Sequence, residues 1–181
     1  MSLHLIMGCM FSGKTSTLIN IAKKQKLVNK KVLIINFEGD TRYSSSNKIT
    51  THDNVSFDCI PCARDLLFFI TQNHNYKSAD IICINEGQFF DKLVEFCLQV
   101  VSDNKTVYVC GLDGDYLKRP FGEILNLIPH CETVCKLQAL CMSCKTGTPA
   151  SFTKKLTSSD DLVEIGSTET YMPVCRYCYE N

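Results

Sequence analysis

The sequence lacks an excess of charge of either sign, and it lacks any long apolar run. Its 181 residues carry 19 Lys and Arg against 19 Asp and Glu, which gives a formal net charge of zero at pH 7. Since proteins that bind nucleic acid normally present a basic face, this balance argues against nucleic acid as a partner. No apolar stretch approaches the ~20 residues that span a bilayer, so we expect no association with a membrane.

The chain also lacks a secretory signal, internal repeats and extended low-complexity tracts. Its N-terminus, MSLHLIMGCM, has neither the basic segment nor the apolar segment of a signal peptide. We therefore expect a cytoplasmic protein, in which the 12 cysteines are thiols or metal ligands and not disulfides. The length fits one medium domain, or one domain with a small appendage.

Short apolar segments alternate with amphipathic ones over residues 1–140. The apolar segments are expected to be strands at 2–7, 31–37, 80–85, 106–111 and 133–140, and the amphipathic ones helices at 16–29, 63–73 and 91–103. Strands that are apolar on both faces are typical of a parallel sheet covered by helices on both sides. The polar segment 38–54 has no periodicity and is expected to be a long surface loop.

Residues 8–15 read GCMFSGKT, which matches the phosphate-loop pattern G-x-x-x-x-G-K-[ST] between an expected strand and an expected helix. The two glycines allow the backbone to curl, so that its N–H groups point at phosphate near a helix N-terminus. Lys14 would reach the β- and γ-phosphates, and the Thr15 hydroxyl would ligate Mg²⁺. The sequence therefore predicts an α/β P-loop nucleotide-binding domain with a mostly parallel sheet. The predicted ATP-binding residues of the loop are Gly8, Cys9, Met10, Phe11, Ser12, Gly13, Lys14 and Thr15.

The strand expected at 80–85 ends in Asn85, and Glu86 follows directly. In P-loop folds a neighbouring strand ends close to the phosphate loop and usually presents an acidic residue to the metal. Glu86 would then be the base for an attacking hydroxyl or water, and Asn85 would offer a neutral oxygen to a metal-bound water. The alternative is that Asn85, Glu86 and Gly87 only form a turn, since Asn and Gly favour turns.

Two C-x-x-C pairs, Cys141 with Cys144 and Cys175 with Cys178, are separated by 30 residues. Four thiolates in two such pairs match a tetrahedral structural Zn²⁺ site, which has no open position for substrate. We expect a small zinc-binding module over 141–181, separate from the P-loop domain over 1–140, with a loop at 145–174 held at its base.

The other cysteines are expected to be mostly ordinary thiols, although the third C-x-x-C pair could also compete for metal. Cys59 and Cys62 form a third C-x-x-C pair, which is either a redox pair or, as we favour, two ordinary thiols where a helix begins near Pro61. The rest lie among apolar residues and are expected to be small core residues, namely Cys9, Cys83, Cys97, Cys110, Cys131 and Cys135.

Several blocks of the chain, in the same order, resemble the thymidine kinases of the cytosolic, poxvirus-like type. The blocks are MFSGKT (10–15), DTRYSSS (40–46), THD (51–53), EGQFF (86–90), GLDGDYLKRPFG (111–122) and ASFTKKL (150–156), together with the C-x-x-C pairs of the zinc module. The resemblance covers nearly the whole chain. It implies transfer of the ATP γ-phosphoryl group to the 5′-hydroxyl of thymidine, a lasso-like zinc module, a homotetramer and inhibition by dTTP.

The resemblance also implies roles for individual residues. Glu86 matches the catalytic base for the 5′-hydroxyl, while Lys14 and Arg42 match residues at the phosphates. Asp40, Asn85 and Gln88 would lie with them at the ATP and Mg²⁺ site. The implied thymidine-binding residues are Met10, Phe89, Leu112, Asp115, Tyr116, Phe121, Val163, Glu164, Ile165, Gly166 and Tyr171.

Four residues depart from the family pattern. Cys9 replaces Pro, Asn85 replaces Asp, Asp115 replaces a small hydroxyl residue, and Lys155 replaces Arg. Because Asn85 carries no charge, the alternatives are a degenerate kinase that only binds nucleotide, or a kinase of another deoxynucleoside. A nucleic-acid-binding ATPase with a zinc ribbon is a further rival, which the zero net charge opposes. The other residues matching the catalytic set are intact, so we expect an active kinase that is slow or has a high Mg²⁺ requirement.

Overall fold

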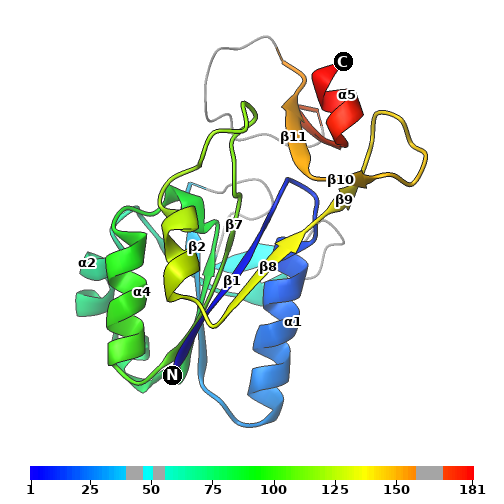
Figure 1. Ribbon diagram of the computed structural model, residues 1–181. Coiled ribbons are helices and arrows are strands. Elements are labelled where there is room, and N and C mark those ends of the chain that lie inside the picture. The colour runs from blue at the N-terminus through cyan, green and yellow to red at the C-terminus, as the bar shows by residue number, and fades with distance from the viewer. Residues whose placement is uncertain (40–46, 51–55, 158–168) are drawn as a thin grey trace.

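A computed structural model describes residues 1–39, 47–50, 56–157 and 169–181. Its centre is a six-stranded sheet in the order β5-β2-β6-β7-β1-β8, in which every pair of neighbours is parallel (Figure 1). The strands are β1 (Ser2–Gly8), β2 (Val32–Phe37), β5 (Ile60–Cys62), β6 (Ile81–Asn85), β7 (Thr106–Gly111) and β8 (Thr133–Leu137). The predicted mostly parallel α/β sheet is confirmed.

Two apolar layers cover the two faces of this sheet, because successive strand residues point to opposite sides. Ile82 and Ile84 of β6 belong to one buried cluster, whereas Ile81 and Cys83 belong to the other. Helix α1 (Lys14–Leu27) packs on the second face, and α2 (Leu66–Gln72), α3 (His74–Ser78), α4 (Leu93–Ser102) and the 3₁₀ segment η2 (Ile124–His130) cover the first (Figure 1). No helix in the described part of the chain is both long and apolar enough to cross a membrane.

A smaller assembly of short strands follows β8 and lies beyond one end of the sheet (Figure 1). It contains β9 (Ala139–Leu140), β10 (Pro149–Ala150), β11 (Phe152–Lys155), β12 (Tyr171–Val174) and helix α5 (Arg176–Glu180). β9 pairs with β10 and β11 pairs with β12, both antiparallel. Its own apolar cluster is built around Cys141, Ala150, Val174 and Cys175.

The segment expected to be one long loop, 38–54, contains a strand. β3 (Lys48–Thr50) pairs antiparallel with β4 (Ser56–Asp58), so the prediction of a loop throughout was wrong there. Ile49 supplies the reason, since its side chain is 3% exposed and packs in the cluster under α1.

Two other local predictions also need correction. Pro61 does not start a helix but lies in β5, the edge strand next to β2, where a missing backbone N–H is tolerated. The helix begins later, at Leu66, because the Asp65 carboxylate caps it by accepting a hydrogen bond from the Phe68 N–H at 2.9 Å. Cys135 is exposed, because it lies on the other edge strand, β8.

All the parallel strands end at the same edge of the sheet. β1 ends at Gly8, β6 at Asn85 and β7 at Gly111, and the register places Met7 opposite Gly111 and Asn36 opposite Asn85. Ligands of open α/β sheets bind at the carboxyl ends of the strands. This edge is therefore where the candidate site is expected.

Candidate active site

The loop between β1 and α1 needs glycine at both ends. Gly8 has φ +152°, and a Cβ there would collide with the Leu137 carbonyl oxygen and lie 2.9 Å from the Ser12 hydroxyl. Gly13 has φ +83° and is the residue before the first turn of α1, with no side chain to cap it. Phe11, with φ +63°, is a non-glycine residue in the left-handed region, which costs on the order of 1–3 kcal/mol. The loop thus has a specific curled backbone.

This loop fits an anionic group. The Ser12 Oγ atom is buried and has no hydrogen-bond partner among the described residues. The Lys14 ammonium is buried and donates to the Cys9 carbonyl oxygen at 2.7 Å, so it lies over the loop. The first N–H groups of α1 add the donors that a helix leaves unpaired at its start. An unpaired buried hydroxyl, an ammonium group and free N–H groups are what phosphate oxygens require.

A chain of polar side chains connects the start of α1 to β6 and β2. The Thr15 Oγ1 donates to the Asn85 Oδ1 at 3.2 Å, and the Asn85 Nδ2 donates to the Asn36 Oδ1 at 2.7 Å. The Cys110 thiol, at the end of β7, also donates to the Asn85 Oδ1, at 3.0 Å. Asn85 is 2% exposed, and its polar atoms are therefore paired within the protein. The Thr15 hydroxyl is held at the sheet edge, as a ligand of Mg²⁺ would need to be.

Glu86 lies in a tight turn next to this chain of contacts. Its φ of +57° places a non-glycine residue in the left-handed region, and its side chain is buried. The Gln88 Nε2 donates to the Glu86 Oε2 at 2.7 Å, while the Gln88 Oε1 accepts a hydrogen bond from the Leu112 N–H at 2.9 Å. The turn is therefore present, and within it Glu86 is a buried, hydrogen-bonded carboxylate close to the end of β6.

An aromatic cluster lies around Phe89, three residues after Glu86. Phe89 stacks on Phe37 with ring centroids 4.8 Å apart and meets Phe121 edge-on at 5.3 Å. Phe89, Phe121 and Leu112 are only half-buried. The structure therefore brings these sequence-predicted residues of the thymidine site to one region, with apolar surface still accessible.

Asp115 organises the loop after β7. Its Oδ1 accepts hydrogen bonds from the Leu117 N–H at 2.8 Å and the Arg119 N–H at 2.9 Å, and its Oδ2 pairs with the Arg119 Nε at 2.8 Å. Tyr116, the next residue of this loop, contacts the C-terminal assembly. Its carbonyl oxygen accepts from the Tyr179 hydroxyl at 2.6 Å, and the Lys155 ammonium lies 5.2 Å from the centre of its ring.

The C-terminal assembly also contacts the loop of residues 8–13 directly. The Met10 N–H donates to the Thr153 Oγ1 at 3.0 Å, and the Cys9 thiol donates to the Ala150 carbonyl oxygen at 3.3 Å. Burial raises the pKa of the Cys9 thiol, which keeps its proton available for this bond. Tyr171, on β12, is buried as well. A role for Thr153 was not predicted, because the block ASFTKKL does not reveal which backbone N–H its hydroxyl meets.

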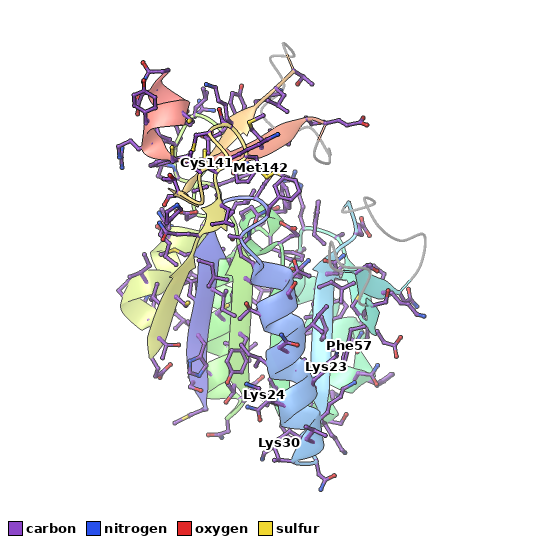
Figure 2. All side chains as sticks on the ribbon, turned by 90° about the vertical axis from the view of Figure 1, so that its right-hand side faces the viewer. Lys23, Lys24, Lys30, Phe57, Cys141 and Met142 are labelled. Carbon is purple, nitrogen blue, oxygen red and sulfur yellow. The ribbon has the colours of Figure 1, made fainter. Side chains whose placement is uncertain are left out.

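The four cysteines of the two C-x-x-C pairs converge in space. Their sulfur atoms all lie within 4.8 Å of one another, and Figure 2 shows Cys141 with Met142 at the opposite end of the molecule from Lys30. Hydrogen bonding from the Cys144 backbone lowers the pKa of the Cys141 thiol to about 6, and Thr146 lowers that of Cys144. A cluster of four cysteines at this spacing can hold a metal ion, which binds their sulfur atoms in the thiolate form.

Cys62, in the third pair, has the opposite character. Burial, followed by the nearby carboxylates of Glu38 and Asp65, raises the pKa of its thiol to about 12. A thiol with that pKa does not supply a reactive thiolate near neutral pH.

Six predicted site residues lie outside the described residues, namely Asp40, Arg42, Val163, Glu164, Ile165 and Gly166.

Comparison with known proteins gives one consistent family. The model of the family described as "Thymidine kinase" matches residues 1–179. The chain is 43% identical over 177 residues to the thymidine kinase of Yaba monkey tumor virus, covering 98% of this chain and 93% of that protein. It is 40% identical over 177 residues to the human cytosolic thymidine kinase, covering 98% and 72%. A solved DNA replication initiation factor has a TM-score of 0.43 and 14% identity over 75% of this chain and 40% of that chain, which supports no conclusion. The chain belongs to the thymidine kinase family.

Proposed function

We propose that this protein transfers the γ-phosphoryl group of ATP to the 5′-hydroxyl of thymidine and so produces thymidine monophosphate. The observation that carries the proposal is the position of a buried, hydrogen-bonded carboxylate, Glu86, at the sheet edge where the anion-binding loop of residues 8–15 begins. Membership of the thymidine kinase family supports the same activity. It does not favour a degenerate kinase.

The loop of residues 8–15 is the proposed site of the ATP phosphates. Its N–H groups and the Ser12 hydroxyl would bind phosphate oxygens, and Lys14 would exchange its bond to the Cys9 carbonyl for the β- and γ-phosphates. Thr15 is the residue that would hold Mg²⁺ directly, together with phosphate oxygens and water, while Asn85 would support it by accepting the hydrogen bond of the Thr15 hydroxyl. When bound, Mg²⁺ supplies neutralisation of the charge on those phosphates.

Glu86 is the proposed base. As the 5′-oxygen forms its bond to the γ-phosphorus, the bond from that phosphorus to the β-bridging oxygen breaks and ADP leaves. The proton of the 5′-hydroxyl passes to the Glu86 carboxylate. Gln88 fixes the orientation of that carboxylate through the 2.7 Å bond to Oε2, so that its geometry is set before thymidine arrives.

The thymidine site is proposed to lie between the sheet edge and the C-terminal strands. Its apolar wall would comprise Met10, Phe89, Leu112, Tyr116 and Phe121, with Tyr171 and residues 163–166 at the edge of the base. Arg42 and Asp40 are proposed to act at the phosphates. Asp115 is proposed to support this site by holding the loop that carries Tyr116, since both of its oxygens are bonded within that loop.

The remaining features of the proposal concern the assembly of the protein. Residues 141–181 would form a zinc-binding module of the lasso type, attached to a P-loop domain over 1–140, with Zn²⁺ held by the four cysteines. Following the family resemblance, we propose a homotetramer, inhibition by dTTP and a cytoplasmic location, without nucleic-acid or membrane partners.

One assay tests the activity. Purified protein is incubated with ATP, Mg²⁺ and each deoxynucleoside in turn, and monophosphate formation is measured beside a Glu86→Gln variant. Formation of thymidine monophosphate by the wild type and its loss in the variant are expected. Binding of ATP without transfer to any nucleoside would refute the proposal, and transfer to a different deoxynucleoside alone would replace thymidine by that substrate.

A further inference from the structure

We propose that Asn36 is a positioning residue, which orients the Asn85 amide so that the Thr15 hydroxyl keeps its lone pairs for Mg²⁺. This inference rests on the proposed function, because it concerns the metal that accompanies ATP. It assigns a role to a residue of β2 that none of the sequence motifs includes.

The geometry places the two asparagines as a pair. β2 and β6 are neighbouring parallel strands, and Asn36 and Asn85 stand opposite each other in their register. Asn36 is 7% exposed and Asn85 is 2% exposed, so water does not compete strongly for their amides. The bond from the Asn85 Nδ2 to the Asn36 Oδ1, at 2.7 Å, is the shortest of the three that Asn85 makes with its side chain.

An amide has two chemically different ends, and only one arrangement suits the surroundings of Asn85. With Nδ2 on Asn36, the Oδ1 atom accepts from the Thr15 hydroxyl at 3.2 Å and from the Cys110 thiol at 3.0 Å. The Cys110 thiol is buried and donates this hydrogen bond, so it needs an acceptor at this position. Reversing the amide would leave the thiol facing an NH₂ group.

Reversal would also change the Thr15 hydroxyl. In the observed arrangement this hydroxyl donates a hydrogen bond to the Asn85 Oδ1, which leaves its own oxygen lone pairs for a cation. In the reversed arrangement it would accept a hydrogen bond from Nδ2, which would occupy a lone pair and place an amide hydrogen next to the metal. The Asn36 carbonyl therefore keeps the Thr15 hydroxyl available to Mg²⁺, although Asn36 contacts Asn85 and not Thr15 itself.

A carboxylate at position 85 would not need this help, because its two oxygens are equivalent. The requirement for Asn36 is thus specific to a chain that carries Asn at position 85. It gives a physical reason why a neutral side chain can stand at that position while the Thr15 hydroxyl stays correctly oriented.

The test uses ADP binding, measured by calorimetry with and without Mg²⁺ on the full chain. Asn36→Leu has a similar volume but no acceptor. We expect the affinity of this variant for ADP without Mg²⁺ to stay within about two-fold of wild type. The factor by which Mg²⁺ enhances that affinity should fall about ten-fold, because an unpaired buried amide produces an effect of this size. If Asn36→Leu does not fold, as judged by thermal melting, Asn36→Ala replaces it.

Two further variants separate orientation from general damage. Asn36→Asp keeps an acceptor for Nδ2 and should retain the Mg²⁺ enhancement to within about three-fold. In an Asn85→Asp background, Asn36→Leu should reduce the enhancement much less than it does beside Asn85, which is a non-additive result for two residues in contact.

The outcomes divide clearly. The inference would be overturned if Asn36→Leu reduced the Mg²⁺ enhancement of ADP affinity equally beside Asn85 and beside Asp at position 85, or left it unchanged beside Asn85. It would also be overturned if Asn36→Asp reduced the enhancement as much as Asn36→Leu does. A wild-type protein that binds ADP with no Mg²⁺ enhancement would instead refute the proposed metal site itself. Thymidine phosphorylation by the wild type, measured separately, shows whether the proposed activity holds in either case.

Discussion

Gln88 offers a quantitative test of how the proposed base is held. It is 3% exposed and bonds at both ends, to the Glu86 carboxylate at 2.7 Å and to the Leu112 N–H at 2.9 Å. Gln88→Met keeps the length of the side chain and removes both bonds. A hydrogen bond to a charged group contributes ~1.5–3 kcal/mol, and an unpaired buried N–H costs ~1–3 kcal/mol. Because the Leu112 N–H is only partly buried, we expect a loss of about 2–4 kcal/mol in the free energy of unfolding.

The same change should affect catalysis more than binding. Without Gln88 the Glu86 carboxylate is no longer fixed toward the 5′-hydroxyl, and small misplacements of a reacting group can cost on the order of 10²-fold in rate. We expect kcat for thymidine to fall about 10- to 100-fold, with a smaller change in the affinity for ATP. Urea unfolding and steady-state kinetics measure the two effects.

Gln99→Met is a matched control, because Gln99 donates to a carboxylate too, at 2.9 Å to Asp103, but on the exposed surface of α4. Its loss in the free energy of unfolding should stay below about 0.5 kcal/mol, with kcat unchanged. If Gln88→Met were no less stable than Gln99→Met and equally active, Gln88 would not hold Glu86 and the reasoning would be refuted.

Three more changes test other parts of the structure. Cys175→Ser should abolish the one zinc ion per chain expected in wild type and weaken thymidine binding, measured by metal analysis and calorimetry; a zinc-free wild type would contradict the proposed site. Thr153→Val removes the acceptor of the Met10 N–H and should cost about 1–3 kcal/mol in unfolding free energy, whereas an unchanged value would show that this bond contributes nothing. Burial raises the pKa of Cys83 to about 12, so its contribution to stability is complete below the ordinary thiol pKa near 9 and lost as the pH rises toward 12. The unfolding free energy should therefore fall less steeply with pH over this range in Cys83→Ala than in wild type, by up to ~1.4 kcal/mol per pH unit. An unchanged slope of unfolding free energy against pH would contradict the burial argument.

The sequence predicted those elements whose signal is local. β1, β2, β6 and β7 are apolar on both faces, and a strand with that property fits only the interior of a covered sheet. The curled loop between β1 and α1 was predictable because its backbone requires glycine at the fixed positions 8 and 13.

The elements that were missed carry weak or misleading local signals. β3 and β4 lie in a polar segment, where Ile49 and Phe57 are the apolar residues that mark the hairpin. β5 contains Pro61, which favours a helix start as well as an edge strand. Cys135 looked like a core residue because its neighbours are apolar, but only the sheet order reveals that β8 is an edge.

The candidate site was predictable at the level of motifs and not at the level of contacts. Glu86 and Lys14 follow from spacing and from the family resemblance. The bond between Asn36 and Asn85 depends on the register of two strands that are 49 positions apart in the chain, and the bond between Thr153 and Met10 spans 143 positions. No local pattern specifies such pairings, since the tertiary packing determines them.

The most direct test of the central claim is the rate of thymidine monophosphate formation from ATP and thymidine with Mg²⁺, measured for the wild type and for Glu86→Gln. We predict turnover by the wild type and a loss of at least about 10²-fold in kcat for the variant, with ADP still bound. A wild type that transfers no phosphoryl group to thymidine, or a variant with the wild-type rate, would contradict the account.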